Sequence, residues 1–170
     1  MRLPRYLQAP LLFHRPSGWL GALRTYLVIT LISHLTWEII HLPLYTIWST
    51  ASPRELAFAV LHCTAGDLLI ALATLMGSLA LIGDQDWPFR GRLRVAGLTV
   101  FGGLIYTIFS EWFNTGIKGT WAYSDLMPTL PLIGTGLSPL LQWVLIPMLA
   151  LAAMGRISQD GPDADPSPRD

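Results

Sequence analysis

Residues 25–45 read TYLVITLISHLTWEIIHLPLY, an apolar run that carries two histidines and one glutamate. A helix of about 20 apolar residues crosses a hydrocarbon core about 30 Å thick, so this run is long enough to span a membrane. An ionisable side chain in hydrocarbon costs about 2.5–3.5 kcal/mol on insertion scales, and such residues therefore face the interior of a bundle. The run predicts a membrane-spanning helix with one polar face.

Three more stretches of the chain have the same character. The sequence is 52% hydrophobic and 13% charged, whereas soluble domains carry about 25% charged residues. We predict an all-α polytopic integral membrane protein, a four-helix transmembrane bundle with a longer outer loop between its third and fourth helices. Residues 1–157 would form this single domain, and residues 158–170, rich in Asp and Pro, would be a disordered cytoplasmic tail. The predicted helices cover about 24–48, 55–82, 95–116 and 138–155.

The basic residues predict how the bundle is oriented. Nine of the 11 Lys and Arg residues lie before the first helix, between the second and third, or after the fourth, and only Arg54 and Lys118 lie on the other side. The positive-inside rule assigns the richer side to the cytoplasm. We therefore expect a multi-pass protein of the cell inner (plasma) membrane with both termini cytoplasmic. The basic residues are too dispersed to indicate a nucleic-acid partner.

Each predicted helix carries polar side chains that a lipid-facing helix lacks. At 100° per residue, those of the first helix share one narrow face, and so do those of the third. On the second helix His62 and Asp67 are about 140° apart, so only one can point at the bundle axis, and Asp67 is slightly favoured. Most of these residues lie in the outer half and the cytoplasmic half is almost purely apolar, which predicts a polar cup that opens to the outer face. They are His34, Glu38, His41, His62, Asp67, Glu111, Asn114 and Gln142.

One spacing suggests a metal site. Glu38 and His41 form a Glu-x-x-His pair, which places a carboxylate and an imidazole one helical turn apart, as in metal-binding helix bundles. The same spacing recurs at Glu111, but there Asn114 replaces the histidine and removes a good ligand. A metal-free site is therefore favoured, and a divalent metal stays an alternative. Its expected ligands are Glu38, His41, His62 and Glu111.

Without a metal, the same residues suit acid–base catalysis. Buried carboxylates and imidazoles can exchange protons with a bound substrate, so Glu38, His41 and Glu111 are the candidate catalytic residues. The alternative is that these polar groups only hold helices together, for about 0.6–2 kcal/mol per pair. The candidate substrate-binding residues are Trp37, Asp67, Trp112, Asn114, Trp121, Tyr123, Gln142 and Trp143.

The predicted outer loop, residues 117–137, is rich in proline and aromatic residues, among them Trp121 and Tyr123. Such a composition suits a segment that packs over the helix ends better than a mobile linker. Two interpretations have equal weight: a lid over the cup, or an interfacial loop that lies on lipid headgroups.

These observations predict a small intramembrane enzyme that acts on a lipid or isoprenoid-like substrate, by acid–base or metal-assisted chemistry in the polar cup. The alternative is a non-catalytic lipid-binding or assembly subunit of a membrane complex. The expected partner is a membrane lipid or other apolar small molecule, and a membrane-protein partner is the alternative. In outline the chain resembles the emopamil-binding-protein superfamily, whose small four-helix domains hold acidic residues, His, Asn and Trp around a sterol-sized pocket. The resemblance is architectural and implies no residue roles here.

Overall fold

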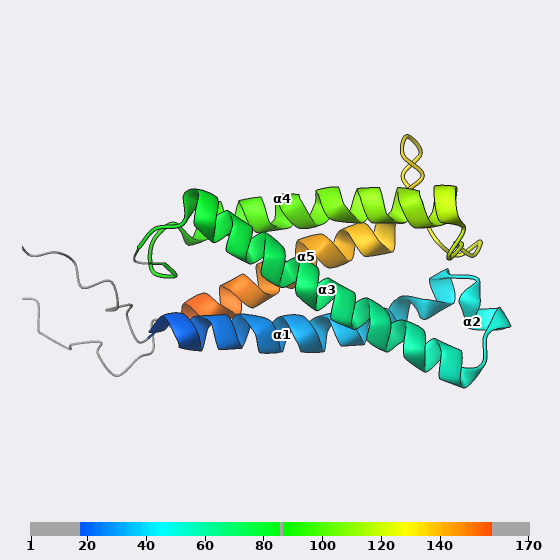
Figure 1. Cartoon of the computed structure of the whole chain (residues 1–170), viewed down its shortest axis with the longest axis horizontal. Coiled ribbons are helices and arrows are strands. Elements are labelled where there is room, and N and C mark those ends of the chain that lie inside the picture. Colours follow the sequence, from blue (N-terminus) through cyan, green and yellow to red (C-terminus); the bar gives the residue numbers. More distant parts are fainter. Residues whose placement is uncertain (1–17, 86, 158–170) are drawn as a thin grey trace, which may run out of the picture.

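The computed structural model describes residues 18–85 and 87–157, so the predicted tail at 158–170 lies outside the described residues. The described residues form helices joined by turns and irregular connections, with two isolated β-bridges and no strand, which confirms the all-α prediction. Figure 1 shows the long helices side by side along one axis. The elements are α1 (Gly18–His41), the 3-10 helix η2 (Leu42–Leu44), α2 (Ile47–Thr50), α3 (Pro53–Ile82), α4 (Arg92–Glu111), the π-helix η3 (Trp112–Lys118) and α5 (Leu137–Ile157).

Four helices in the described residues are long and apolar enough to cross a membrane, as predicted. Their bounds differ from the predicted ones because individual residues end or start the helices. α1 ends at His41, because Pro43 has no N–H for continued helical bonding. α3 begins at Pro53 because Ser52 and Glu55 form a capping box, with the Ser52 N–H donating to the Glu55 carboxylate at 2.8 Å. The four candidate spans are Trp19–Leu44, Pro53–Ile82, Arg92–Lys118 and Leu137–Met154.

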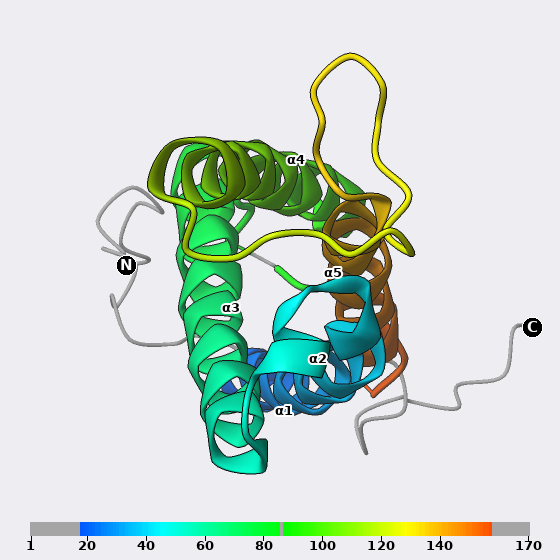
Figure 2. The same ribbon diagram turned by 90° about the vertical axis from the view of Figure 1, so that its right-hand side faces the viewer.

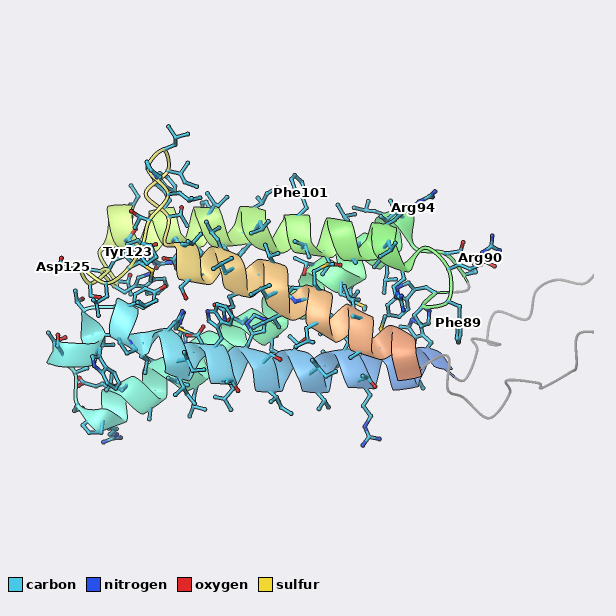
Figure 3. All side chains as sticks on the ribbon, turned by 180° about the vertical axis from the view of Figure 1, so that it is seen from behind. Phe89, Arg90, Arg94, Phe101, Tyr123 and Asp125 are labelled. Carbon is cyan, nitrogen blue, oxygen red and sulfur yellow. The ribbon has the colours of Figure 1, made fainter. Side chains whose placement is uncertain are left out.

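The four long helices form a ring, in which α1 packs on α3 and α5, and α4 packs on the same two helices (Figure 2). The start of α1, the end of α5 and the α3–α4 connection lie together at what we call the terminal end. The opposite end, which we call the strap end, carries η2, α2 and the connection 119–136. Figure 3 shows Phe89 and Arg90 at the terminal end and Tyr123 and Asp125 at the strap end.

The interior of the terminal half is mostly apolar but holds buried hydroxyls. Tyr26, Leu75 and Met154 are fully buried there. Ser78 and Thr99 are buried among them, and the Thr99 hydroxyl donates to Ser78 Oγ at 3.2 Å. The Ser78 hydroxyl in turn donates to the carbonyl of the preceding turn at 2.7 Å. Hydroxyls can be buried in this way because the helix backbone supplies their partners.

α3 and α4 are in close contact only in the terminal half. There a Cβ atom added at Gly102 would lie 3.2 Å from Thr74 Cγ2, so the two backbones approach closely. Toward the strap end α3 diverges from α4 and comes to lie near α2 (Figure 1). The ring is therefore tightly packed at one end and open between two of its helices at the other.

The connection 119–136 has two parts. Residues 119–127, the strap, cross the strap end of the ring (Figure 2) and are bonded to the chain just after α1. The Ser124 N–H donates to the Leu44 carbonyl at 2.9 Å, and the Thr46 N–H donates to the Ala122 carbonyl at 3.0 Å. Residues 128–136, the hairpin, project sideways from the bundle (Figure 1), closed by the Leu130 N–H donating to the Thr135 carbonyl at 3.0 Å.

Candidate functional site

A pocket of about 820 Å³ lies between the strap-end halves of the four long helices, with η2, α2 and the strap contributing to its wall. Most of the sequence-predicted site residues line it, although they come from all four parts of the chain. The predicted residues in the lining are Glu38, His41, His62, Asp67, Glu111, Asn114, Trp121, Gln142 and Trp143.

One wall of the pocket is a hydrogen-bonded group centred on Gln142, which we call the Gln142 cluster. It consists of His34, Glu38 and His41 from α1, Asp67 from α3, and Gln142 from α5. The Gln142 amide nitrogen lies 2.8 Å from His34 Nδ1, 2.9 Å from Asp67 Oδ2 and 3.0 Å from Glu38 Oε1. One buried amide therefore joins three helices, and it orients two carboxylates that line the pocket.

The Gln142 cluster must share a proton between its members. The Gln142 amide nitrogen carries two hydrogens but has three acceptor atoms within 3.0 Å. His34 Nδ1 and Asp67 Oδ2 are also 3.0 Å apart, which requires a hydrogen on one of them. Either the imidazole donates to the carboxylate or a protonated Asp67 donates to the imidazole. In either assignment one hydrogen joins the His34 imidazole to the Asp67 carboxylate.

His41 is the member of this cluster nearest to the strap end. His41 Nε2 lies 3.1 Å from Glu38 Oε2, and Nδ1 lies 3.2 Å from Ser138 Oγ. Trp37 Nε1–H donates to the same Ser138 oxygen at 3.2 Å. One assignment satisfies all three contacts: Ser138 donates to His41 Nδ1, and His41 Nε2–H donates to Glu38. In that tautomer the Glu38–His41 pair holds a proton at the edge of the pocket.

The other wall is formed by Glu111, at the end of α4. The Tyr123 hydroxyl of the strap donates a short hydrogen bond to Glu111 Oε2 and accepts one from the Gly136 N–H at 2.9 Å. Burial and the hydrogen bond to Glu111 raise the pKa of Tyr123, so it stays a protonated donor at neutral pH. The strap therefore fixes one carboxylate oxygen of Glu111.

Two features of the sequence bring these walls into place. His34, Glu38 and His41 follow one another at helical spacing and are all buried, at 0%, 7% and 7% exposure, which confirms the predicted inward face of α1. Gly103 on α4 leaves room for the indole of Trp143, whose ring packs 5.2 Å from that of His34. A larger residue at position 103 would push this wall outward.

Four of the predicted residues lie elsewhere than the prediction implied. Trp112 is 53% exposed and packs beside Phe109 outside the pocket. Trp37 does not line the pocket but supports it through Ser138. Tyr123 lies behind Glu111 and contacts it instead of the pocket. His62 is exposed at the pocket rim and stacks on Phe58, whereas Asp67 joins the cluster, as the angular argument favoured.

Asn114 does not play the role that its spacing from Glu111 suggested. Its amide donates to the Ser110 carbonyl at 2.8 Å, in the preceding turn, and not to Glu111. Among the described residues, no three His, Cys, Asp or Glu side chains are grouped as a metal ion requires. The structure thus offers no support for the expected ligand set of Glu38, His41, His62 and Glu111.

Sequence reasoning did not assign roles to several residues that shape the pocket. Tyr45 packs against both His41 and Tyr123, with ring centroids 5.3 and 5.6 Å away. Its position four residues after His41 was the available signal. Gly66 and Lys118 line the pocket without a polar pattern that could have identified them. Their contribution follows only from the way α3 diverges from α4.

Comparison with family models, with curated proteins and with solved structures gives no match to this chain. The likeness to the emopamil-binding-protein superfamily stays one of outline, and the function has to be inferred from the geometry of the site.

Proposed function

We propose that this protein is a small intramembrane enzyme that acts on a lipid or isoprenoid-like molecule by acid–base chemistry. The observation that carries the proposal is that two separately organised acidic groups, the Gln142 cluster and Glu111, line one pocket from opposite walls. A single polar pair would suffice to hold two helices together. Two walls that leave space between them suit a bound substrate.

The roles of the two walls follow from their hydrogen bonds. Glu38 is paired with His41, and this pair would deliver a proton to the substrate from the α1 side. Glu111 accepts the Tyr123 hydrogen on one oxygen, and its second oxygen would take a proton from the substrate. Protonation at one wall and deprotonation at the other moves a hydrogen within the substrate and leaves the enzyme's proton count unchanged. Asp67 and Gln142 would orient Glu38, and Trp121 and Trp143 would contact the apolar part of the substrate.

The test replaces each glutamate by glutamine, which has nearly the same shape but cannot transfer a proton. We expect the free energy of unfolding of the Glu38→Gln and Glu111→Gln variants in detergent to lie within about 1 kcal/mol of that of the parent, since neither change leaves a new buried charge. Both should fail to restore the membrane-lipid profile of a deletion strain, measured by mass spectrometry. Asp125→Asn is the matched control, because Asp125 is an exposed strap carboxylate outside the pocket. Full complementation by both glutamine variants would refute acid–base catalysis.

One observation favours a second candidate, an assembly subunit of a membrane complex. The hairpin presents Leu132, 98% exposed, at a tip that projects from the bundle (Figure 2), and no charged residue occurs between positions 126 and 138. Such a tip could insert into a neighbouring membrane protein. A photo-reactive residue at position 132 would then form one stoichiometric cross-linked product, whereas an enzyme that works alone would give only lipid adducts.

A further inference from the structure

The pocket continues to the outside of the bundle between α3 and α4. In the terminal half these helices touch, at Ser78 with Thr99 and at Thr74 with Gly102. One turn closer to the strap end, Ile70 and Tyr106 line the pocket instead, and the next turns continue in this way with Gly66 and Ser110. The direct helix–helix contact is thus replaced by a slot that begins where α3 diverges from α4.

The edges of the slot face both the pocket and the outside. Phe58 and Tyr106 line the pocket and are 69% and 44% exposed. These side chains are apolar or aromatic, as expected where a surface meets lipid chains. The polar residues of the rim, Glu55 and Lys118, also line the pocket and lie at the strap-end limit of α3 and η3. The slot therefore runs from a polar rim into an apolar side opening.

The end of the ring is partly covered. The strap crosses it (Figure 2), and backbone hydrogen bonds join the strap to the chain around Tyr45. The Tyr45 ring packs between His41 and Tyr123. A molecule that approached along the bundle axis would meet the strap and the polar rim, whereas a molecule in the lipid would meet the apolar slot directly.

The α3 side of the slot is built from small residues that leave space. Ala59, Cys63 and Gly66 line the pocket at helical spacing. A Cβ atom added at Gly66 would meet no other atom within 4 Å. This open volume has the shape that a hydrocarbon chain could fill, with its polar end directed at the Gln142 cluster and Glu111.

The charges of the residues that line the pocket determine which lipid head groups it can accept. Four acidic side chains line the pocket, and Lys118 is the only Lys or Arg among the lining residues. Lys118 lies at the rim, with its ammonium 5.0 Å from the Phe113 ring. A negatively charged head group would be placed next to carboxylates in a medium of low dielectric, which is unfavourable. A hydroxyl group can donate to and accept from the same residues, and a carbonyl group can accept from them, without that cost. The acidic residues are Glu38, Glu55, Asp67 and Glu111.

We propose that the site takes the uncharged, oxygen-bearing end of a lipid, which enters sideways through the slot between α3 and α4 while its hydrocarbon part lies along Ala59, Cys63 and Gly66. This inference rests on the proposed function for the location of the site, and adds the route and the charge class of the ligand. Anionic lipids such as prenyl phosphates and fatty acids are excluded as ligands of the deep site.

The test uses two photo-reactive probes with the same isoprenoid chain, a free alcohol and its phosphate monoester, added to the full chain in uncharged vesicles. We expect saturable labelling of the pocket by the alcohol and none by the phosphate. Gly66→Phe should abolish the alcohol labelling because the ring fills the slot. Gly77→Phe is the matched control: Gly77 is on the same helix, is exposed outside the pocket, and also has open space around it. Gly66→Leu repeats the test with a smaller side chain, and melting curves show that each variant is folded.

Each possible result decides the matter. Equal labelling of Gly66→Phe, Gly66→Leu and parent by the alcohol would overturn the slot as the route, and saturable pocket labelling by the phosphate would overturn the charge selection. The labelling measures binding and needs no turnover, so it can succeed even if Glu38→Gln and Glu111→Gln retain full function. In the double glutamine variant the phosphate should gain labelling, because two of the excluding carboxylates are gone.

Discussion

The amide of Gln142 allows a sharp test of how much the Gln142 cluster stabilises the bundle. Replacing Gln142 by leucine keeps a similar volume, so packing changes little, but it removes the donor that joins α1, α3 and α5. The side chain is 2% exposed, so water is not expected to replace the lost donor readily. We expect the variant to fold and to be less stable than the parent.

The size of the effect follows from the geometry. The amide nitrogen has three neighbours but only two hydrogens, so the Gln142→Leu substitution removes two hydrogen bonds. Hydrogen bonds between helices in membranes contribute about 0.6 kcal/mol on average and up to about 1.7 kcal/mol. The expected loss is therefore about 1–3 kcal/mol. Proton uptake by a carboxylate left without its donor keeps the loss toward the lower end of this range.

The free energy of unfolding is measured in mixed micelles, by titration with a denaturing detergent while tryptophan fluorescence is followed. Thr107→Val is the matched control. Thr107 is equally buried, but its hydroxyl bonds only to the Gly103 carbonyl of its own helix, so its loss should cost less than about 0.5 kcal/mol. A Gln142→Leu variant as stable as the Thr107→Val variant would show that the cluster does not hold the helices together.

Two further predictions concern orientation and packing. In a Cys63→Ser background, an impermeant thiol reagent added outside intact cells should label Asp125→Cys but not Phe89→Cys. The two residues are exposed and lie at opposite ends of the bundle (Figure 3). The reverse labelling pattern would refute the predicted topology. Gly103→Ala should lower the free energy of unfolding by about 1–3 kcal/mol, since its Cβ would overlap a buried indole. Gly97→Ala, on an open face of the same helix, should be neutral or slightly stabilising, and equal effects of the two changes would contradict the packing described.

The helices could be predicted because hydrophobic length is a local property of the sequence. The four runs at about 24–48, 55–82, 95–116 and 138–155 correspond to the four helices that are long enough to cross a membrane. The bounds were less exact, because they depend on individual residues. Pro43 ends α1 early and the Ser52 capping box starts α3 early, and neither changes the average hydrophobicity of its run.

Features of the site that depend on a single helix could be predicted from the sequence, whereas features that depend on how two helices pack could not. The inward face of α1 follows from angular spacing alone, so Glu38 and His41 were correctly paired. At 100° per residue Trp112 lies about 160° from Asn114, so this arithmetic already placed it away from the polar face, and its exposure agrees with that. The arithmetic could not show that Asn114 bonds to the preceding turn. The pocket itself depends on how far α4 and η3 stand from α3, and this separation is a tertiary property with no counterpart in the periodicity of either helix.

The question whether a polar residue has a structural or a functional role has different answers for Gln142 and for Glu111. Gln142 fixes three helices, yet the same contacts orient Glu38 and Asp67 toward the pocket, so its loss would affect both stability and any reaction. Glu111 is bonded to the strap by the Tyr123 hydroxyl, a neutral donor from which glutamine could also accept. A purely structural residue at position 111 would thus not require a carboxylate, and burying one costs free energy. The presence of an acid on each wall of one pocket is the reason to expect proton transfer there.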